Sequence, residues 1–264
     1  MHSSDKLTLV IGLGEVGRPL YTILRESDPS AVGVDITPTE ITGPAGIMHV
    51  CFPFIIPEGF REAVASYAAR YRPEIIVINS TVVPGTTKAL EKLTGIPCVY
   101  SPVRGKHTKM AEDLRFYVKF VAGQSPQATE RVKGHFEAAG LKSKTMTSPE
   151  ALELAKLLET TYFGLLIAWA QEMNRFSACH NADYFEVGSF FEEIAYLPRV
   201  LFKPGVIGGH CVMQNIELLS RQFDSDFWIA IKNSNNSRRA ELNTVEERAS
   251  RERLEPIKLA SEYA

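Results

Sequence analysis

LTLVIGLGEVGRPL, residues 7–20, is the stretch that decides the fold. Its apolar run from Leu7 to Ile11 is typical of a buried strand, and the residues after the glycines have helical spacing. Between the two, Gly12, Gly14 and Gly17 follow the pattern GxGxxG. In a strand-turn-helix unit, the first glycine makes the turn, the second lets the backbone approach a pyrophosphate and the third allows close helix packing. The stretch therefore predicts a dinucleotide-binding turn of the Rossmann type.

The cofactor is indicated by Asp35, which ends the second apolar run. A carboxylate about 20 residues after the glycines accepts hydrogen bonds from the ribose of NAD, and its charge repels the 2′-phosphate of NADP. We therefore expect NAD, with FAD and a methyl donor as weaker alternatives on the same turn chemistry. The residues expected to bind the cofactor are Gly12, Gly14, Glu15, Val16, Gly17, Asp35, Pro53, Ser80 and Thr81.

Apolar runs and helical patterns alternate through the first half of the chain. Further strands are expected at 31–34, 47–52, 74–79, 97–100 and 118–122, and helices at 58–71, 86–93 and 127–139. This alternation predicts an α/β fold with a Rossmann-like, doubly wound parallel sheet over residues 1–147. The short Pro- and Gly-rich connection between Asp35 and Ile47 leaves no room for the usual extra helix and strand, so we expect a shortened sheet.

A long helix is expected from Ser148, where an N-cap residue, a proline and an acid follow one another. As far as Ser177 its only glycine is Gly164, and apolar residues lie on more than one of its faces. Such a helix is typically buried between domains or subunits. We expect it to open an α-helical second domain, 148–264, that binds substrate and forms a homodimer.

The bulk composition excludes several classes of function. Hydrophobic residues make up 45% and charged residues 23%, which is ordinary for a globular protein, and the net charge of −2 argues against a nucleic-acid or anionic-membrane partner. The polar start is unlike a secretory signal, and no apolar run is long enough to span a bilayer, so a cytoplasmic protein is expected. The four cysteines have no CxxC spacing, so neither a metal site nor a disulfide framework is expected.

Four separated segments together resemble the UDP-glucose/GDP-mannose dehydrogenase family. In chain order they are GLGEVGRPL at 12–20, VINSTVVPGTT at 77–87, the helical segment 148–172 and KPGVIGGHCV at 203–212. The resemblance implies oxidation of a primary alcohol, in a nucleotide sugar or a smaller molecule, to an acid with two NAD⁺. It also implies that Cys211 is the nucleophile that forms a thiohemiacetal, that Lys156 stabilises the oxyanion and that Thr81 positions water or substrate.

The sequence departs from the family's pattern at three of its functional positions. Thr160 stands where the family has an asparagine four residues after the lysine, and Asn215 stands where it has an acid four residues after the cysteine. Both remain candidate catalytic residues. Val103 replaces a glutamate often proposed to assist hydrolysis, so these changes put the thioester step in doubt.

Two alternative functions stay open from the sequence. The first is a two-electron dehydrogenase of the β-hydroxyacid type, which also places a lysine on the long helix and needs no cysteine. The second is a non-catalytic scaffold or regulatory homologue, which the replaced acidic partners favour. The chain also stops about where the family's third domain, which holds much of the nucleotide, would begin, so the sequence leaves the substrate open.

Overall fold

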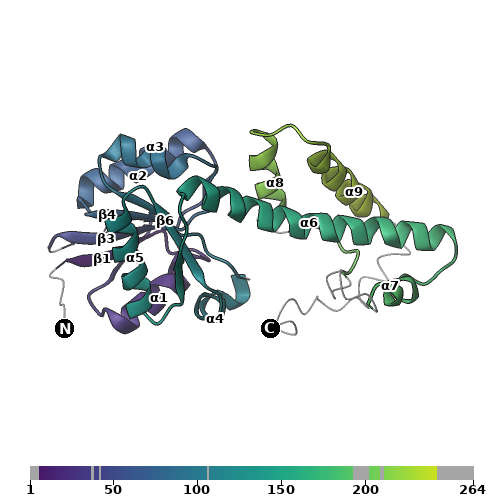
Figure 1. Ribbon diagram of the computed structural model, residues 1–264, viewed down its shortest axis with the longest axis horizontal. Coiled ribbons are helices and arrows are strands. Elements are labelled where there is room, and N and C mark those ends of the chain that lie inside the picture. Colours follow the sequence, from purple (N-terminus) through teal and green to yellow (C-terminus); the bar gives the residue numbers. More distant parts are fainter. Residues whose placement is uncertain are drawn as a thin grey trace. The chain divides into compact units, whose positions relative to one another are not determined.

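The computed structural model describes residues 6–36, 39–41, 43–105, 107–192, 202–208 and 211–242 (Figure 1). The chain divides into two compact units, Met1–Leu157 and Leu158–Ala264. The division falls inside the long helix α6, Pro149–Cys179, which begins one residue after Ser148. The Ser148 hydroxyl accepts a hydrogen bond from the backbone N–H of Ala151 at 3.1 Å, as an N-cap residue does.

The first unit is built on a sheet with the strand order β2-β1-β3-β4-β5-β6-β7. The strands are β1 (Leu7–Ile11), β2 (Val32–Val34), β3 (Ala45–Val50), β4 (Ile75–Ile78), β5 (Cys98–Tyr100), β6 (Lys119–Gly123) and β7 (Ser143–Thr145). The first five strands are parallel where they pair. The expected α/β sheet is therefore confirmed. Between β2 and β3 the described residues form no helix or strand, as the short connection predicted.

One strand departs from the expected parallel arrangement. β6 pairs with β5 in the antiparallel direction, while β7 is parallel to β6. The antiparallel direction agrees with a contact of Lys119, whose ammonium donates to the carbonyl of Ser101 at 2.8 Å. Because Lys119 begins β6 and Ser101 directly follows β5, the start of one strand lies beside the end of the other. The short polar strand β7 was not predicted, since Ser-Lys-Thr has no apolar run.

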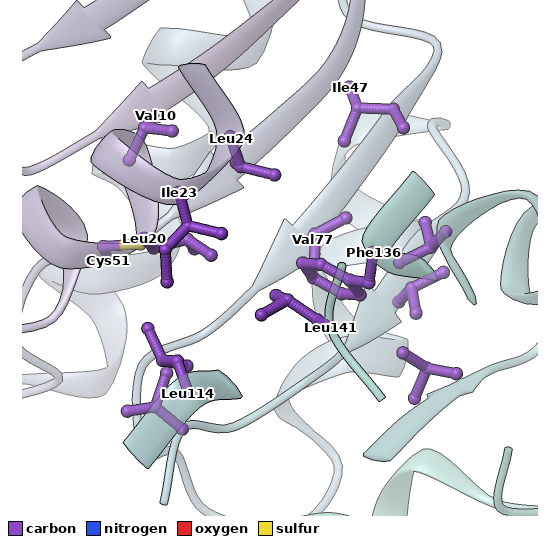
Figure 2. Close-up of a cluster of buried hydrophobic side chains, with 14 of the residues drawn as sticks. Val10, Leu20, Ile23, Leu24, Ile47, Cys51, Val77, Leu114, Phe136 and Leu141 are labelled. Atoms are coloured by element: carbon purple, nitrogen blue, oxygen red, sulfur yellow. The ribbon is translucent and has the colours of Figure 1, made fainter. Parts of the chain in front are cut away.

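Helices cover both faces of the sheet (Figure 1). On one face lie α1 (Gly17–Ser27), α4 (Met110–Phe116) and α5 (Pro126–Ala138), and on the other α2 (Pro57–Tyr71) and α3 (Thr86–Thr94). Figure 2 shows the core under the first group, to which Leu20 and Ile23 of α1, Leu114 of α4, Phe136 of α5 and Val77 of the sheet belong. Helix α4 and the 3-10 turn at His107–Lys109 were not predicted.

The second unit is helical, as expected. Besides the larger part of α6 it contains α7 (Tyr184–Glu192), α8 (Val212–Ser220) and α9 (Asp226–Leu242). Helix α9 begins well before the charged stretch expected from Arg238, and residues 243–264 of that stretch lie outside the described residues. Helix α6 was expected to be buried on several faces, but within this chain Leu158, Tyr162 and Trp169 are 44%, 55% and 53% exposed.

Buried polar groups interrupt the core on the α5 side of the sheet. The Nε2 atoms of His49 in β3 and His135 in α5 lie 3.1 Å apart, and the rings stack. Lys119 is also buried, with its ammonium 4.8 Å from the centre of the Phe136 ring. Burial lowers the pKa of Lys119 to about 7 and that of His135 to about 4, and it holds the pKa of His49 well below the usual value. The cluster therefore accepts little additional positive charge.

The histidine pair makes the stability of the protein fall in acid. A histidine in an unfolded chain has a pKa near 6.5, so between pH 6.5 and about 4 the unfolded chain binds protons that the folded one refuses. The contribution of the histidine pair is therefore complete above pH 6.5 and is lost as the pH falls toward 4. Allowing for the partial exposure of His135, we expect a loss of about 1–2 kcal/mol between pH 7 and 5 from this pair.

Urea unfolding at pH 7, 6 and 5 measures this loss. His135→Gln keeps a hydrogen-bonding group opposite His49 but cannot be protonated, so the slope of stability against pH is expected to flatten. The matched control is His180→Gln, because His180 is exposed beyond the end of α6. An unchanged slope in His135→Gln contradicts the assignment.

Candidate functional site

The glycine turn of the first unit has the geometry that a phosphate cradle needs. Gly12 has φ +88°, a conformation that favours glycine, and its N–H donates to the carbonyl of Val34 at 2.7 Å. A Cβ on Gly17 would lie 1.7 Å from the carbonyl oxygen of Gly12, so α1 can reach the turn only without a side chain there. A Cβ on Gly14 would meet nothing within 4 Å. The turn is therefore closed on its protein side and open at Gly14.

The loops that follow the parallel strands meet at the same edge of the sheet. The strand order reverses at β1, because β2 lies on one side of β1 and β3 on the other. Ligands of open α/β sheets bind at such switch points. Asp35 after β2 and Pro53 after β3 are exposed. Glu15 in the turn is exposed as well, and Val16 is half-buried as the N-cap residue of α1.

Ser80 and Thr81, which follow β4, have different surroundings. The Ser80 side chain is buried, and its hydroxyl donates to the carbonyl of Phe52 at 2.6 Å, which ties the end of β4 to the end of β3. Thr81 is half-buried. Ser80 therefore contributes to the loop structure, while Thr81 is the more accessible of the two expected residues.

Glu153 anchors this loop from helix α6. Its carboxylate accepts hydrogen bonds from the N–H of Gly85 at 2.6 Å, the N–H of Thr87 at 2.8 Å and the hydroxyl of Thr87 at 2.6 Å. These groups form the N-terminus of α3, where a negative charge is favoured. Burial raises the pKa of the Glu153 carboxyl, and the hydrogen bonds from Thr87 and Gly85 oppose that shift. The Glu153 carboxylate thus holds residues 85–87, shortly after Thr81, against the turn of α6 that also carries Lys156.

Thr160 on α6 and Asn215 on α8, two of the residues that depart from the family's pattern, contact each other. Lys156 and Thr160 are half-buried on successive turns of α6. The amide Nδ2 of the buried Asn215 donates to the hydroxyl of Thr160 at 2.6 Å. The two residues thus form a complementary pair that joins α8 to α6, and an amide that donates in this way is not a proton acceptor. The third departure, Val103, is buried in the core of the first unit.

Cys211 is the residue immediately before α8 and is exposed. The unpaired N–H groups of a helix N-terminus favour negative charge, so this is a suitable place for a thiolate or an oxyanion. Cys179 is also exposed, whereas Cys51 and Cys98 are buried and their pKa is raised to about 12 by burial. Gly209 and His210, which precede Cys211, lie outside the described residues.

Several buried polar residues around these segments were missed from the sequence. They are Glu153 and Gln171 on α6 and Asn235 and Arg238 on α9. One signal was available for the first two, because residues 18 apart lie on the same helix face and Leu157, Gly164 and Ala168 lie on that face as well. Within the described ranges no group of His, Cys, Asp and Glu is suited to a metal, and no helix there is long and apolar enough to cross a membrane.

The fold is a Rossmann-type sheet domain followed by a helical unit, and comparisons with known proteins agree with it. Residues 150–237 match the model of the UDP-glucose/GDP-mannose dehydrogenase family, central domain. The UDP-N-acetyl-D-mannosamine dehydrogenases of Pyrococcus horikoshii and Methanocaldococcus jannaschii are each 24% identical, over 83% and 88% of this chain. The chain is therefore similar to UDP-glucose/GDP-mannose dehydrogenases, and the resemblance expected from its sequence is confirmed. It spans 65% and 63% of the length of these two relatives.

Solved structures share the fold. The UDP-D-ManNAc dehydrogenase of Pyrococcus horikoshii superimposes with a TM-score of 0.79 at 18% identity, over 94% of this chain and 72% of the other. A 3-hydroxyisobutyrate dehydrogenase of Mycobacterium tuberculosis superimposes with a TM-score of 0.67 at 13% identity, over 90% of this chain and 94% of the other. The fold is thus shared with a UDP-D-ManNAc dehydrogenase and with a 3-hydroxyisobutyrate dehydrogenase.

Proposed function

We propose that this protein is an NAD-dependent dehydrogenase that oxidises a primary alcohol of a nucleotide sugar to an acid. The observation that carries the proposal is the glycine turn, which is closed by backbone contacts at Gly12 and Gly17 and open at Gly14. A turn of this geometry accommodates a pyrophosphate against the N-terminus of α1. The substrate class is taken from the relatives, which are UDP-sugar dehydrogenases by name.

The first unit suits a nicotinamide dinucleotide. Gly14 leaves space for the pyrophosphate, and the exposed carboxylate of Asp35 is available to the ribose hydroxyls. Ile36, beside it, is 93% exposed and offers an apolar surface to an adenine ring. Thr81 and Pro53 would lie along the same edge of the sheet. NAD⁺ supplies the hydride acceptor when bound.

The chain's own residues would carry the remaining chemistry. The thiol of Cys211 adds to the aldehyde formed by the first oxidation, which makes a carbon–sulfur bond and a thiohemiacetal. Loss of a second hydride to NAD⁺ and of the hydroxyl proton would give a thioester, and water would cleave it to the acid and regenerate the thiol. Lys156 stabilises the oxyanion as a cation. Because Asn215 donates to Thr160, neither replaces the missing acid, and we expect the hydrolysis step to limit the rate.

A second candidate is a two-electron dehydrogenase that oxidises a smaller hydroxy acid. It is favoured by the likeness to the 3-hydroxyisobutyrate dehydrogenase, whose chain is covered almost completely. In that reaction Lys156 acts on the alcohol and Cys211 has no role. A scaffold without catalysis is the third candidate, and the replaced residues Val103, Thr160 and Asn215 favour it.

The first experiment is a calorimetric titration of the whole protein with NAD⁺ and NADH, followed by turnover with UDP-sugars. Saturable binding that weakens in Asp35→Ala is the expected result. Two NADH per acid formed then supports the nucleotide-sugar reaction, and one NADH per oxidised hydroxy acid supports the second candidate. Absence of binding at millimolar cofactor overturns both and leaves the scaffold.

We further propose a homodimer formed through an exposed stripe of α6. Leu158, Tyr162, Trp169 and Phe176 are separated by four and seven residues, so they lie along one helix face, and each is between 44% and 56% exposed. Monomeric proteins rarely expose a contiguous apolar surface of this kind. Sedimentation equilibrium is expected to give a dimer that Trp169→Asp converts to a monomer. Phe223→Asp, which changes an exposed residue off this helix, is the control, and a monomeric wild type contradicts the proposal.

A further inference from the structure

The backbone that leads to Cys211 is held by side chains. Its described part, residues 202–208, forms no helix or strand, so its carbonyl and N–H groups need other partners. The amide of Asn235 donates to the carbonyl of Ile207 at 3.0 Å and accepts from the N–H of Ile207 at 2.7 Å. Gln171 donates to the carbonyl of Gly205 at 2.6 Å, and Arg238 donates to the carbonyl of Pro204 at 2.5 Å. We refer to Gln171, Asn235 and Arg238 as the clamp.

The clamp allows the segment little freedom. Gln171 and Asn235 are completely buried and Arg238 is 5% exposed, so movement of the segment would break hydrogen bonds of buried polar groups, which is costly. Asn235 pairs with both the N–H and the carbonyl of Ile207, which restrains the two peptide units that flank this residue. The Ile207 side chain is buried beside Val212 and Ile216 of α8.

The chain on the other side of Cys211 is fixed as well. A Cβ on Gly164 of α6 would lie 2.5 Å from Cγ1 of Val212, so α8 rests directly on the backbone of α6 at this point. Asn215, one turn further along, is held by Thr160. Cys211 therefore lies between the segment held by the clamp and helix α8, which packs closely on α6.

We propose that Gln171, Asn235 and Arg238 are positioning residues that hold the Cys211 thiol in one place. The proposal rests on the proposed function for the role of Cys211 in catalysis, but its direct consequence, an ordered side chain at position 211, is measurable without turnover. The residues act through the backbone of 204–207, so none of them needs to contact substrate.

A nitroxide spin label reports the order at this position in the full-length protein. Cys51 and Cys98 are buried, so in Cys179→Ser the label attaches at Cys211, and in Cys211→Ser it attaches at the exposed Cys179. Asn235→Ala is expected to shorten the rotational correlation time at position 211 by about twofold or more and to leave that at position 179 unchanged. Asn236→Ala, at the exposed neighbouring position of α9, is the matched control and is expected to change neither.

Two further variants keep the test decisive if Asn235→Ala does not fold. Gln171→Met has nearly the same shape and loses only the hydrogen bonds, and Arg238→Lys keeps one donor for Pro204 and is expected to have the smaller effect. Urea unfolding establishes that each variant is folded. Unchanged mobility at position 211 in folded clamp variants overturns the proposal. Acid formation that survives Cys211→Ser overturns the role of the thiol instead, so the two failures are distinguishable.

Discussion

Replacing Cys211 by alanine is expected to reduce acid formation at least about 1,000-fold. Alanine cannot form the carbon–sulfur bond, so the aldehyde has no covalent intermediate from which a second hydride leaves. The first oxidation does not use the thiol and is expected to continue, with aldehyde as its product. The stoichiometry therefore changes from two NADH per acid to one NADH per aldehyde, which absorbance at the NADH band and an aldehyde trap measure together.

The matched control is Cys179→Ala, because Cys179 is also exposed and belongs to the same unit. Its substitution is expected to leave both oxidations unchanged. Acid and two NADH from Cys211→Ala would contradict the nucleophilic role. Unchanged turnover with one NADH in both the wild type and the variant would favour the two-electron dehydrogenase.

The strands and helices that carry these groups were largely predictable, because local patterns determine them. The apolar runs that form β1, β3 and β4 lie between glycine, proline and charged residues, and Ser148 with Pro149 marks the start of α6. Local patterns also predicted that the described residues between β2 and β3 form no helix or strand. They failed for β7, which has no apolar residue, and for the direction of β6, because strand direction is set by the pairing of distant segments and not by a local pattern.

The supporting contacts of the candidate site were beyond local patterns. Glu153 reaches Gly85 and Thr87 across more than 60 residues, and Asn235 reaches Ile207 across 28. A sequence shows that a polar residue lies on a buried helix face, but only the fold shows which backbone group it satisfies. The residue types that carry chemistry, such as Cys211 and Lys156, are therefore recognised from a motif, whereas the residues that hold them in place are not.

Gly14→Val is expected to weaken NAD⁺ binding about 100-fold, or about 2.7 kcal/mol, without unfolding the protein. Gly14 is not among the glycines with positive φ, and a Cβ there meets no protein atom within 4 Å. The valine side chain therefore fills only the space proposed for the pyrophosphate. Calorimetric titration measures the affinity, and urea unfolding is expected to match the wild type.

Gly17→Ala provides the contrast, because its Cβ would lie 1.7 Å from the carbonyl oxygen of Gly12. Either α1 or the turn must move, so a loss of about 2–4 kcal/mol of stability is expected together with weaker cofactor binding. The two glycines thus separate cofactor space from protein packing within a single turn. If Gly14→Val binds NAD⁺ as the wild type does, the pyrophosphate does not lie against this turn, and the proposed cofactor site is wrong even though the fold around it is right.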